Sequence, residues 1–189
     1  MAKVFNDLIR EQFVYGGKKY ALTTQRESTD QLFDDFGCNW LLGTMAKYCK
    51  RYKNLARERD ILKIACYCYI LWLKKGYQIT SKGLSTDVLD TNVEQKSAYF
   101  EAFVKEFDEA YNTSFAQVDW YNKKKDSLGI HFPVDVVYDK LRSMSKYSTV
   151  HRSQWSQVTD GDLKSIYSCC KLLWEMEYSK VEVHDTDTK

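Results

Sequence analysis

The stretch from Ile64 to Leu73 constrains the fold more than any other part of this sequence. It reads IACYCYILWL and contains no charged residue, so a helix formed there would be apolar on every side. In a water-soluble protein, such a helix must be surrounded by other helices. The sequence therefore predicts a buried central helix over about residues 56–75, with the charged run Arg57-Glu58-Arg59-Asp60 in its first turn.

The rest of the chain is also predicted to be helical. Apolar residues recur at helical spacing from Val4 to Val14, and we expect Gly16-Gly17 to end that first helix and Gly76 to end the central one. No pair of alternating segments joined by a turn signal predicts a sheet. The expected fold class is all-α, a helical bundle around the central helix with a helical C-terminal extension. The remaining helices are expected over about residues 28–36, 39–53, 91–111, 133–144 and 160–178.

The expected domain organisation follows from these helices. Residues 1–76 would form a helical core, and residues 77–91 would connect it to a helical extension over residues 92–178 that packs on the core. Residues 179–189, which end in EVHDTDTK, would be a disordered tail.

Composition and cysteine spacing argue for a cytoplasmic protein. The six cysteines include no CxxC pair, so we interpret them as small buried residues in a reducing compartment. Asp7, Arg10 and Glu11 lie where a signal peptide would be apolar, and the apolar block over residues 61–73 is too short for a membrane span. We therefore expect no membrane partner. The net charge of +2 does not by itself indicate a nucleic-acid-binding protein.

Carboxylates and cations within the first four predicted helices are the main candidates for chemistry. The sequence has no GxxxxGK[ST] motif, and its single His-Asp pair, His184-Asp185, lies in the predicted tail. Asp30 and Asp34 are four residues apart and therefore share a helix face. Together with Asp60 they could hold Mg²⁺, which prefers carboxylate oxygens. The nearby cations would suit a polyphosphate; they are Lys47, Lys50, Arg51, Lys53, Arg57 and Arg59.

A purely structural interpretation of the same residues remains open. An aspartate at a helix start is favoured by the helix dipole and by capping alone. Lysines and arginines before it are equally compatible with a solvated helix face.

Three segments resemble a known family. They are FVYGGKKYA (13–21), NWLLGTMAKYCKRYKN (39–54) and ERDILKIACYCYILWL (58–73). Together they are similar to the phage MazG-like all-α nucleoside triphosphate pyrophosphohydrolases, including the dATP/dGTP diphosphohydrolase group. The resemblance covers about residues 5–76.

This resemblance implies a magnesium-dependent enzyme that cleaves a (deoxy)nucleoside triphosphate to the monophosphate and pyrophosphate. It also implies a helical bundle that is often a homodimer and, for a phage-encoded protein, residence in the host cell cytoplasm. The predicted catalytic residues are Asp60 and Glu58; the predicted substrate-binding residues are Lys18, Lys19, Lys47, Tyr48 and Arg51; the predicted metal ligands are Asp30, Asp34 and Asp60.

The chain departs from the family pattern in its acidic motifs. The ExxE pair is replaced by Asp30 and Asp34, and Glu58 is followed three residues later by Ile61 instead of an aspartate. Two other functions therefore remain as alternatives. The basic tract over residues 47–63 could bind nucleic acid together with nearby aromatic side chains. The C-terminal helices over residues 92–178 could instead dock on a host protein.

Overall fold

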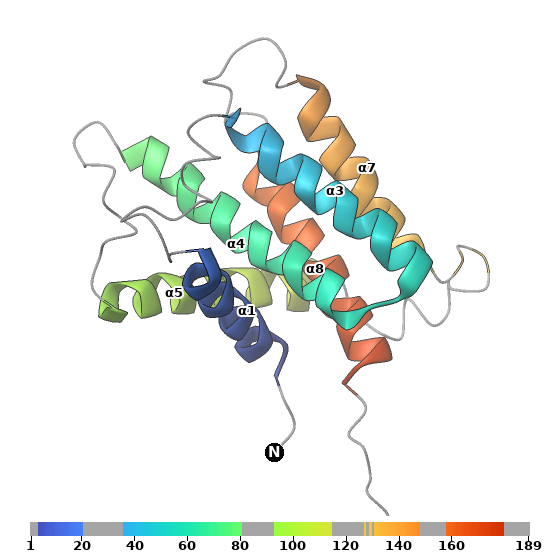
Figure 1. Cartoon of the computed structure of the whole chain (residues 1–189), viewed down its shortest axis with the longest axis horizontal. Helices are drawn as coiled ribbons and strands as arrows, with labels where there is room; N and C mark the ends of the chain where they lie inside the picture. Colours follow the sequence, from blue (N-terminus) through green and yellow to red (C-terminus); the bar gives the residue numbers. More distant parts are fainter. Residues whose placement is uncertain are drawn as a thin grey trace, which may run out of the picture.

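The computed structural model describes residues 4–20, 36–80, 93–114, 127, 129, 131–147 and 158–179. Within these ranges every regular element is a helix (Figure 1), so the all-α prediction is confirmed. The helices are α1 (Phe5–Tyr20), α3 (Cys38–Leu55), α4 (Glu58–Thr80), α5 (Val93–Ser114), α7 (Phe132–Tyr147) and α8 (Asp160–Glu177).

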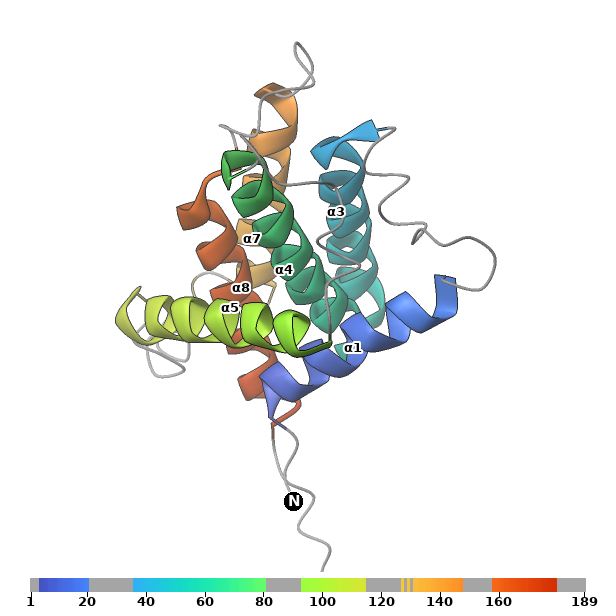
Figure 2. The same ribbon diagram turned by 90° about the vertical axis from the view of Figure 1, so that its left-hand side faces the viewer.

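Four of the helices form the body of the bundle. Helices α3, α4, α7 and α8 lie side by side, while α1 and α5 run across the bundle (Figure 2). Helix α4 contacts α1, α3, α5 and α8, which covers most of its circumference. This position explains why the middle of α4 can be apolar on every side.

The burial of individual side chains confirms α4 as the central helix. Ile64, Ala65, Tyr69 and Leu71 are buried, and Trp72 is partly buried against the same core. Because the main core also includes residues of α5, α7 and α8, helices from both halves of the sequence share one hydrophobic interior.

A cluster of aromatic rings joins α4, α5 and α8. The Phe103 ring lies 4.2 Å from that of Phe107 and 5.1 Å from that of Tyr69, measured between centroids. It also lies 5.8 Å from the Trp72 ring and 5.5 Å from the Tyr167 ring. Such tilted and edge-on pairs add to the stabilisation from burial alone. Phe103 therefore holds three helices together at one point.

The predicted ends of two helices are wrong. Helix α1 continues through Gly16 and Gly17, and α4 continues through Gly76. A glycine favours a helix end when it adopts the left-handed conformation. Among the described glycines only Gly37 and Gly129 have positive φ angles, and Gly37 directly follows a helical residue, Phe36. Residues 77–80, expected in the connector, thus belong to α4, and residues 81–92 and 180–189 lie outside the described part of the chain.

The cysteines are placed as small core residues. Five of the six are buried, and Cys38 is partly exposed. Burial raises the pKa of the thiols of Cys49, Cys66 and Cys169 to about 12. These thiols are therefore protonated near neutral pH, and protonated thiols react poorly as nucleophiles.

This burial gives a measurable expectation for thiol chemistry. In the native protein at pH 8, a disulfide-exchange reagent should rapidly modify at most one thiol, that of Cys38. After denaturation it should modify all six. The melting temperature should be the same with and without reductant. Rapid modification of two or more thiols in the native protein would contradict the core placement.

None of the described helices combines the length and the apolar composition needed to cross a lipid bilayer.

Candidate functional site

Helix α3 has one buried face and one strongly basic outer face. Its apolar side chains Leu41, Met45 and Cys49 are buried in the bundle. Its exposed positions include a stripe along the opposite side of the helix, formed by Gly43, Lys47, Lys50 and Asn54. The same amphipathic pattern that buries the apolar face of α3 therefore places Lys47 and Lys50 on its solvent-exposed face.

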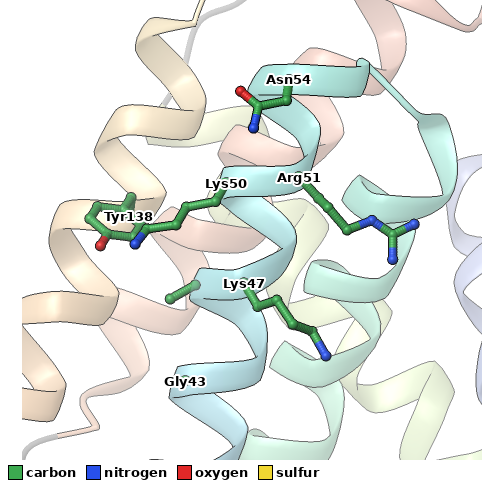
Figure 3. A pocket seen from close by; sticks show the side chains of 7 residues that line it. Gly43, Lys47, Lys50, Arg51, Asn54 and Tyr138 are labelled. Atoms are coloured by element: carbon green, nitrogen blue, oxygen red, sulfur yellow. The ribbon is translucent and has the colours of Figure 1, made fainter.

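This outer face contains a hollow of about 460 Å³, which we call the α3 hollow. Lys50 reaches from α3 toward Tyr138 of α7, while Lys47 and Arg51 extend on the opposite side, toward α4 (Figure 3). The hollow is lined by Gly43, Ala46, Lys47, Lys50, Arg51, Asn54 and Tyr138.

Two of the three cations at the hollow have aromatic rings as neighbours instead of carboxylates. The Lys50 ammonium lies 5.6 Å from the centre of the Tyr138 ring, and that of Lys47 lies 5.1 Å from the Tyr48 ring. Neither lysine forms a salt bridge with a carboxylate of the described residues, whereas Lys53 pairs with Asp135 at 2.6 Å. Among the described residues, no carboxylate therefore neutralises the charge of Lys47 or Lys50.

Gly43 lies at the edge of the hollow without a packing reason for glycine. A Cβ atom built there would meet no atom of the described residues within 4 Å, and Gly43 is not among the glycines with positive φ. Glycine inside a helix is about 1 kcal/mol less favourable than alanine. Neither the packing nor the backbone conformation of α3 requires it, and it leaves the helix backbone open to a close approach from solvent.

Gly43→Ala should therefore stabilise the protein. We expect the free energy of unfolding to rise by about 1 kcal/mol and the melting temperature by about 2–4 °C. Denaturant and thermal unfolding monitored by circular dichroism would measure both. A lower stability would mean that a group outside the described residues covers this position.

Tyr48 does not lie open to a ligand, although it was predicted to bind substrate. Its side chain is buried, and its hydroxyl accepts a hydrogen bond of 3.1 Å from the Lys63 ammonium. The Arg51 guanidinium also lies 5.7 Å from the centre of its ring. Because cations are attracted to the face of an aromatic ring, Tyr48 helps to arrange the basic side chains around it.

Asp60 and Arg51, predicted as catalytic acid and phosphate partner, lie together. The Asp60 side chain is 0% exposed, and its Oδ1 is 3.2 Å from Nη2 of Arg51, whose side chain is 40% exposed. The contact lacks the alignment of a hydrogen bond, and neither Asp60 oxygen has a hydrogen-bond partner in the described structure. A buried carboxylate thus faces a single guanidinium that also lines the hollow.

Glu58 has a contact with the last helix of the bundle. Its Oε1 accepts a hydrogen bond of 2.9 Å from the indole nitrogen of Trp174. Nearby, the Tyr178 hydroxyl donates to the carbonyl of Ala56, a residue with a left-handed backbone (φ 44°) in the turn between α3 and α4. These two bonds tie that turn to α8 and its C-terminal end.

For the other predicted site residues the structure describes no side-chain contacts. Lys18 and Lys19 belong to the last turn of α1, but their side chains are not described. Asp30 and Asp34 lie outside the described residues, as does nearly all of the predicted short helix over residues 28–36.

The described residues do not by themselves fit a magnesium site. They contain no group of three or more His, Cys, Asp or Glu side chains that could hold a metal ion. Of the predicted ligands only Asp60 is among them, and its carboxylate is shielded from solvent and faces a positive charge.

Comparisons with protein-family models, with curated proteins and with solved structures give no match for this chain. The similarity to MazG-like proteins therefore stays a prediction, and the geometry of the α3 hollow has to support any functional proposal.

Part of the hollow was not predicted as a site. Lys50 was recognised as a member of the basic tract, and the spacing of residues 43, 47, 50 and 54 follows one face of a helix. Tyr138 could not be found in this way, because it reaches the site only through the packing of α7 on α3.

Proposed function

We propose that this protein binds the phosphate chain of a nucleotide in the α3 hollow. The observation that carries the proposal is the presence of Lys47, Lys50 and Arg51 around one hollow, two of them without a carboxylate partner among the described residues. A bound phosphate chain would supply the missing negative charge.

The chemistry of the lining suits such a ligand. Ammonium and guanidinium groups form charge-assisted hydrogen bonds with phosphate oxygens, and these bonds are stronger than neutral ones. Asn54 adds an amide that can donate or accept a hydrogen bond. The volume of about 460 Å³ lies within the usual range of sites for small molecules.

A nucleic-acid strand presents the same phosphate chemistry, but the aromatic side chains argue against it. Binding of single strands relies on bases that stack on exposed aromatic rings. Tyr48 and Tyr52, which lie in the basic tract, are both buried. Tyr138 is the one aromatic side chain that lines the hollow and it is partly buried, whereas three cations line the same hollow, which favours a free nucleotide.

Nucleotide hydrolysis is a further proposal that rests on the MazG-like resemblance. It would require a magnesium ion and Asp30 and Asp34, which lie outside the described residues. Binding of phosphate in the α3 hollow does not depend on this activity. Docking of a host protein on the C-terminal helices also stays a prediction.

The binding proposal can be tested by calorimetry and thermal melting. We expect at least one ribo- or deoxyribonucleoside triphosphate to raise the melting temperature, since a ligand of the native state must stabilise it. Lys50→Ala should weaken this binding by about 10–100-fold, the effect of losing one charge-assisted hydrogen bond. Lys105→Ala, which removes the same charge from the exposed face of α5, should not weaken it.

Three outcomes would decide against parts of this proposal. If a short single-stranded oligonucleotide binds and no nucleotide does, the hollow is a nucleic-acid site. If neither binds, or if Lys105→Ala weakens binding as much as Lys50→Ala, the hollow is not a phosphate site. Pyrophosphate release, measured in the same samples with and without Mg²⁺, tests hydrolysis separately.

A further inference from the structure

The buried carboxylate of Asp60 has fewer hydrogen-bond partners in the described structure than a buried charged group usually has. It lies in the first turn of α4 with an exposure of 0%, and no hydrogen bond reaches either of its oxygens in the described structure. The neighbouring Tyr178 hydroxyl donates elsewhere, to the carbonyl of Ala56. Arg51 is its one close charged partner among the described residues.

Such a pair is difficult to explain by stability alone. Burial of an aspartate is unfavourable unless geometry and hydrogen bonding are good, and apolar residues of similar volume often stabilise a protein equally well. Here the contact between the two charges is a single 3.2 Å approach that is not aligned as a hydrogen bond. The arrangement therefore calls for another explanation.

Arg51 offers such an explanation, because its side chain contacts the buried Asp60 and also lines the α3 hollow. One nitrogen of its guanidinium approaches Asp60, while its side chain is 40% exposed and lines the α3 hollow. In Figure 3 the Arg51 side chain extends on the same side of α3 as that of Lys47. The ring of Tyr48 flanks both cations, at 5.7 Å from Arg51 and 5.1 Å from Lys47.

We infer that Asp60 is a positioning residue, which holds the Arg51 guanidinium at the edge of the hollow so that it receives phosphate oxygens. This inference rests on the proposed function. A guanidinium has several N–H donors in a planar fork that matches phosphate. A carboxylate that attracts one of its nitrogens to 3.2 Å limits where the fork can lie, which reduces the entropy lost on binding. Asp60 itself touches no ligand.

The direction in which Asp60→Asn changes the affinity for phosphate distinguishes a positioning role from a purely electrostatic one. Asp60→Asn removes a negative charge close to an anion site. If Asp60 acted only through its charge, the variant would bind phosphate more tightly. If Asp60 positions Arg51, the variant should bind more weakly, because the guanidinium loses the charge that keeps it near the edge of the hollow.

The experiment measures the affinity of the full-length protein for inorganic triphosphate and for the tightest-binding nucleotide. Asp60→Asn should weaken both by about tenfold. Arg51→Met and the double variant Arg51→Met/Asp60→Asn should bind equally weakly, because Asp60 can act only when the guanidinium is present. If Arg51→Met does not fold, Arg51→Lys replaces it, and the effect of Asp60→Asn should shrink in that background.

Each remaining outcome overturns the inference in a recognisable way. Unchanged or tighter binding by Asp60→Asn, together with weaker binding by Lys50→Ala, would remove the positioning role and leave the proposed function intact. If Asp60→Asn lowers the affinity for phosphate equally with and without the Arg51 guanidinium, its effect is a general structural one. If the unaltered protein binds no phosphate compound, the inference and the proposed function both fail.

Discussion

Phe103→Ala should lower the free energy of unfolding by about 3–5 kcal/mol, the usual effect of truncating a buried aromatic side chain. Phe103 is 0% exposed and packs against rings from α4, α5 and α8. Removal of its ring leaves a cavity that rigid neighbours fill incompletely. Since the whole protein is stabilised by only about 5–15 kcal/mol, a loss of this size would place the variant close to unfolding.

Tyr99→Ala provides a matched control on the same helix. Tyr99 is 43% exposed, so its truncation should change the free energy of unfolding by less than about 1 kcal/mol. Urea unfolding at 25 °C would compare the two variants. Equal effects from both would show that α5 does not pack through Phe103 as described.

Arg51→Ala should lower the free energy of unfolding by about 3 kcal/mol at neutral pH, because it leaves a buried carboxylate without its compensating charge. Arg51 itself is 40% exposed, so its side chain alone does not account for a loss of this size. Addition of Asp60→Leu to this variant should restore most of the lost stability, since the double variant no longer buries a charge.

The control for this prediction is Lys47→Ala, a cation on the outer face of the same helix. Lys47 has no carboxylate partner among the described residues, so its removal should have little effect on folding. Thermal and urea unfolding of the four proteins would give the comparison. A loss from Arg51→Ala no greater than that from Lys47→Ala would mean that solvent reaches Asp60.

Much of the fold could be predicted because burial leaves a clear pattern in sequence. The uncharged run from Ile64 to Leu73 could form a water-compatible helix only at the centre of a bundle, and α4 occupies that place. Helix starts near Cys38 and Asp160 were found within a few residues for a similar reason, since apolar periodicity begins there.

Helix ends were harder to predict, because glycine alone does not determine backbone conformation. Gly16, Gly17 and Gly76 were expected to stop their helices, yet α1 and α4 continue through them. A helix passes through glycine at a moderate cost when the following residues still form hydrogen bonds along it. The one left-handed helix cap described here is Ala56, a residue type that gives no such signal.

The site could be predicted only in part, because the sequence shows which residues are charged but not which of them pair. Asp60, Arg51, Lys47 and Tyr48 were identified and do lie close together. The burial of Asp60 and the contact of Glu58 with Trp174 depend on the packing of α4 against α3 and α8. Sequence spacing within one helix contains no information about such contacts.

The packing of α8 against α4 has a consequence for the order in which the molecule can be assembled during translation. Helix α8 begins at Asp160, 80 residues after α4 ends at Thr80, and ribosomes add about 5–20 residues per second. The apolar surface of α4 therefore emerges into the cell several seconds before the helix that covers it. Until then the nascent chain exposes an apolar surface of the kind that chaperones bind. The yield of folded protein therefore depends on whether this surface is protected until α8 has been synthesised.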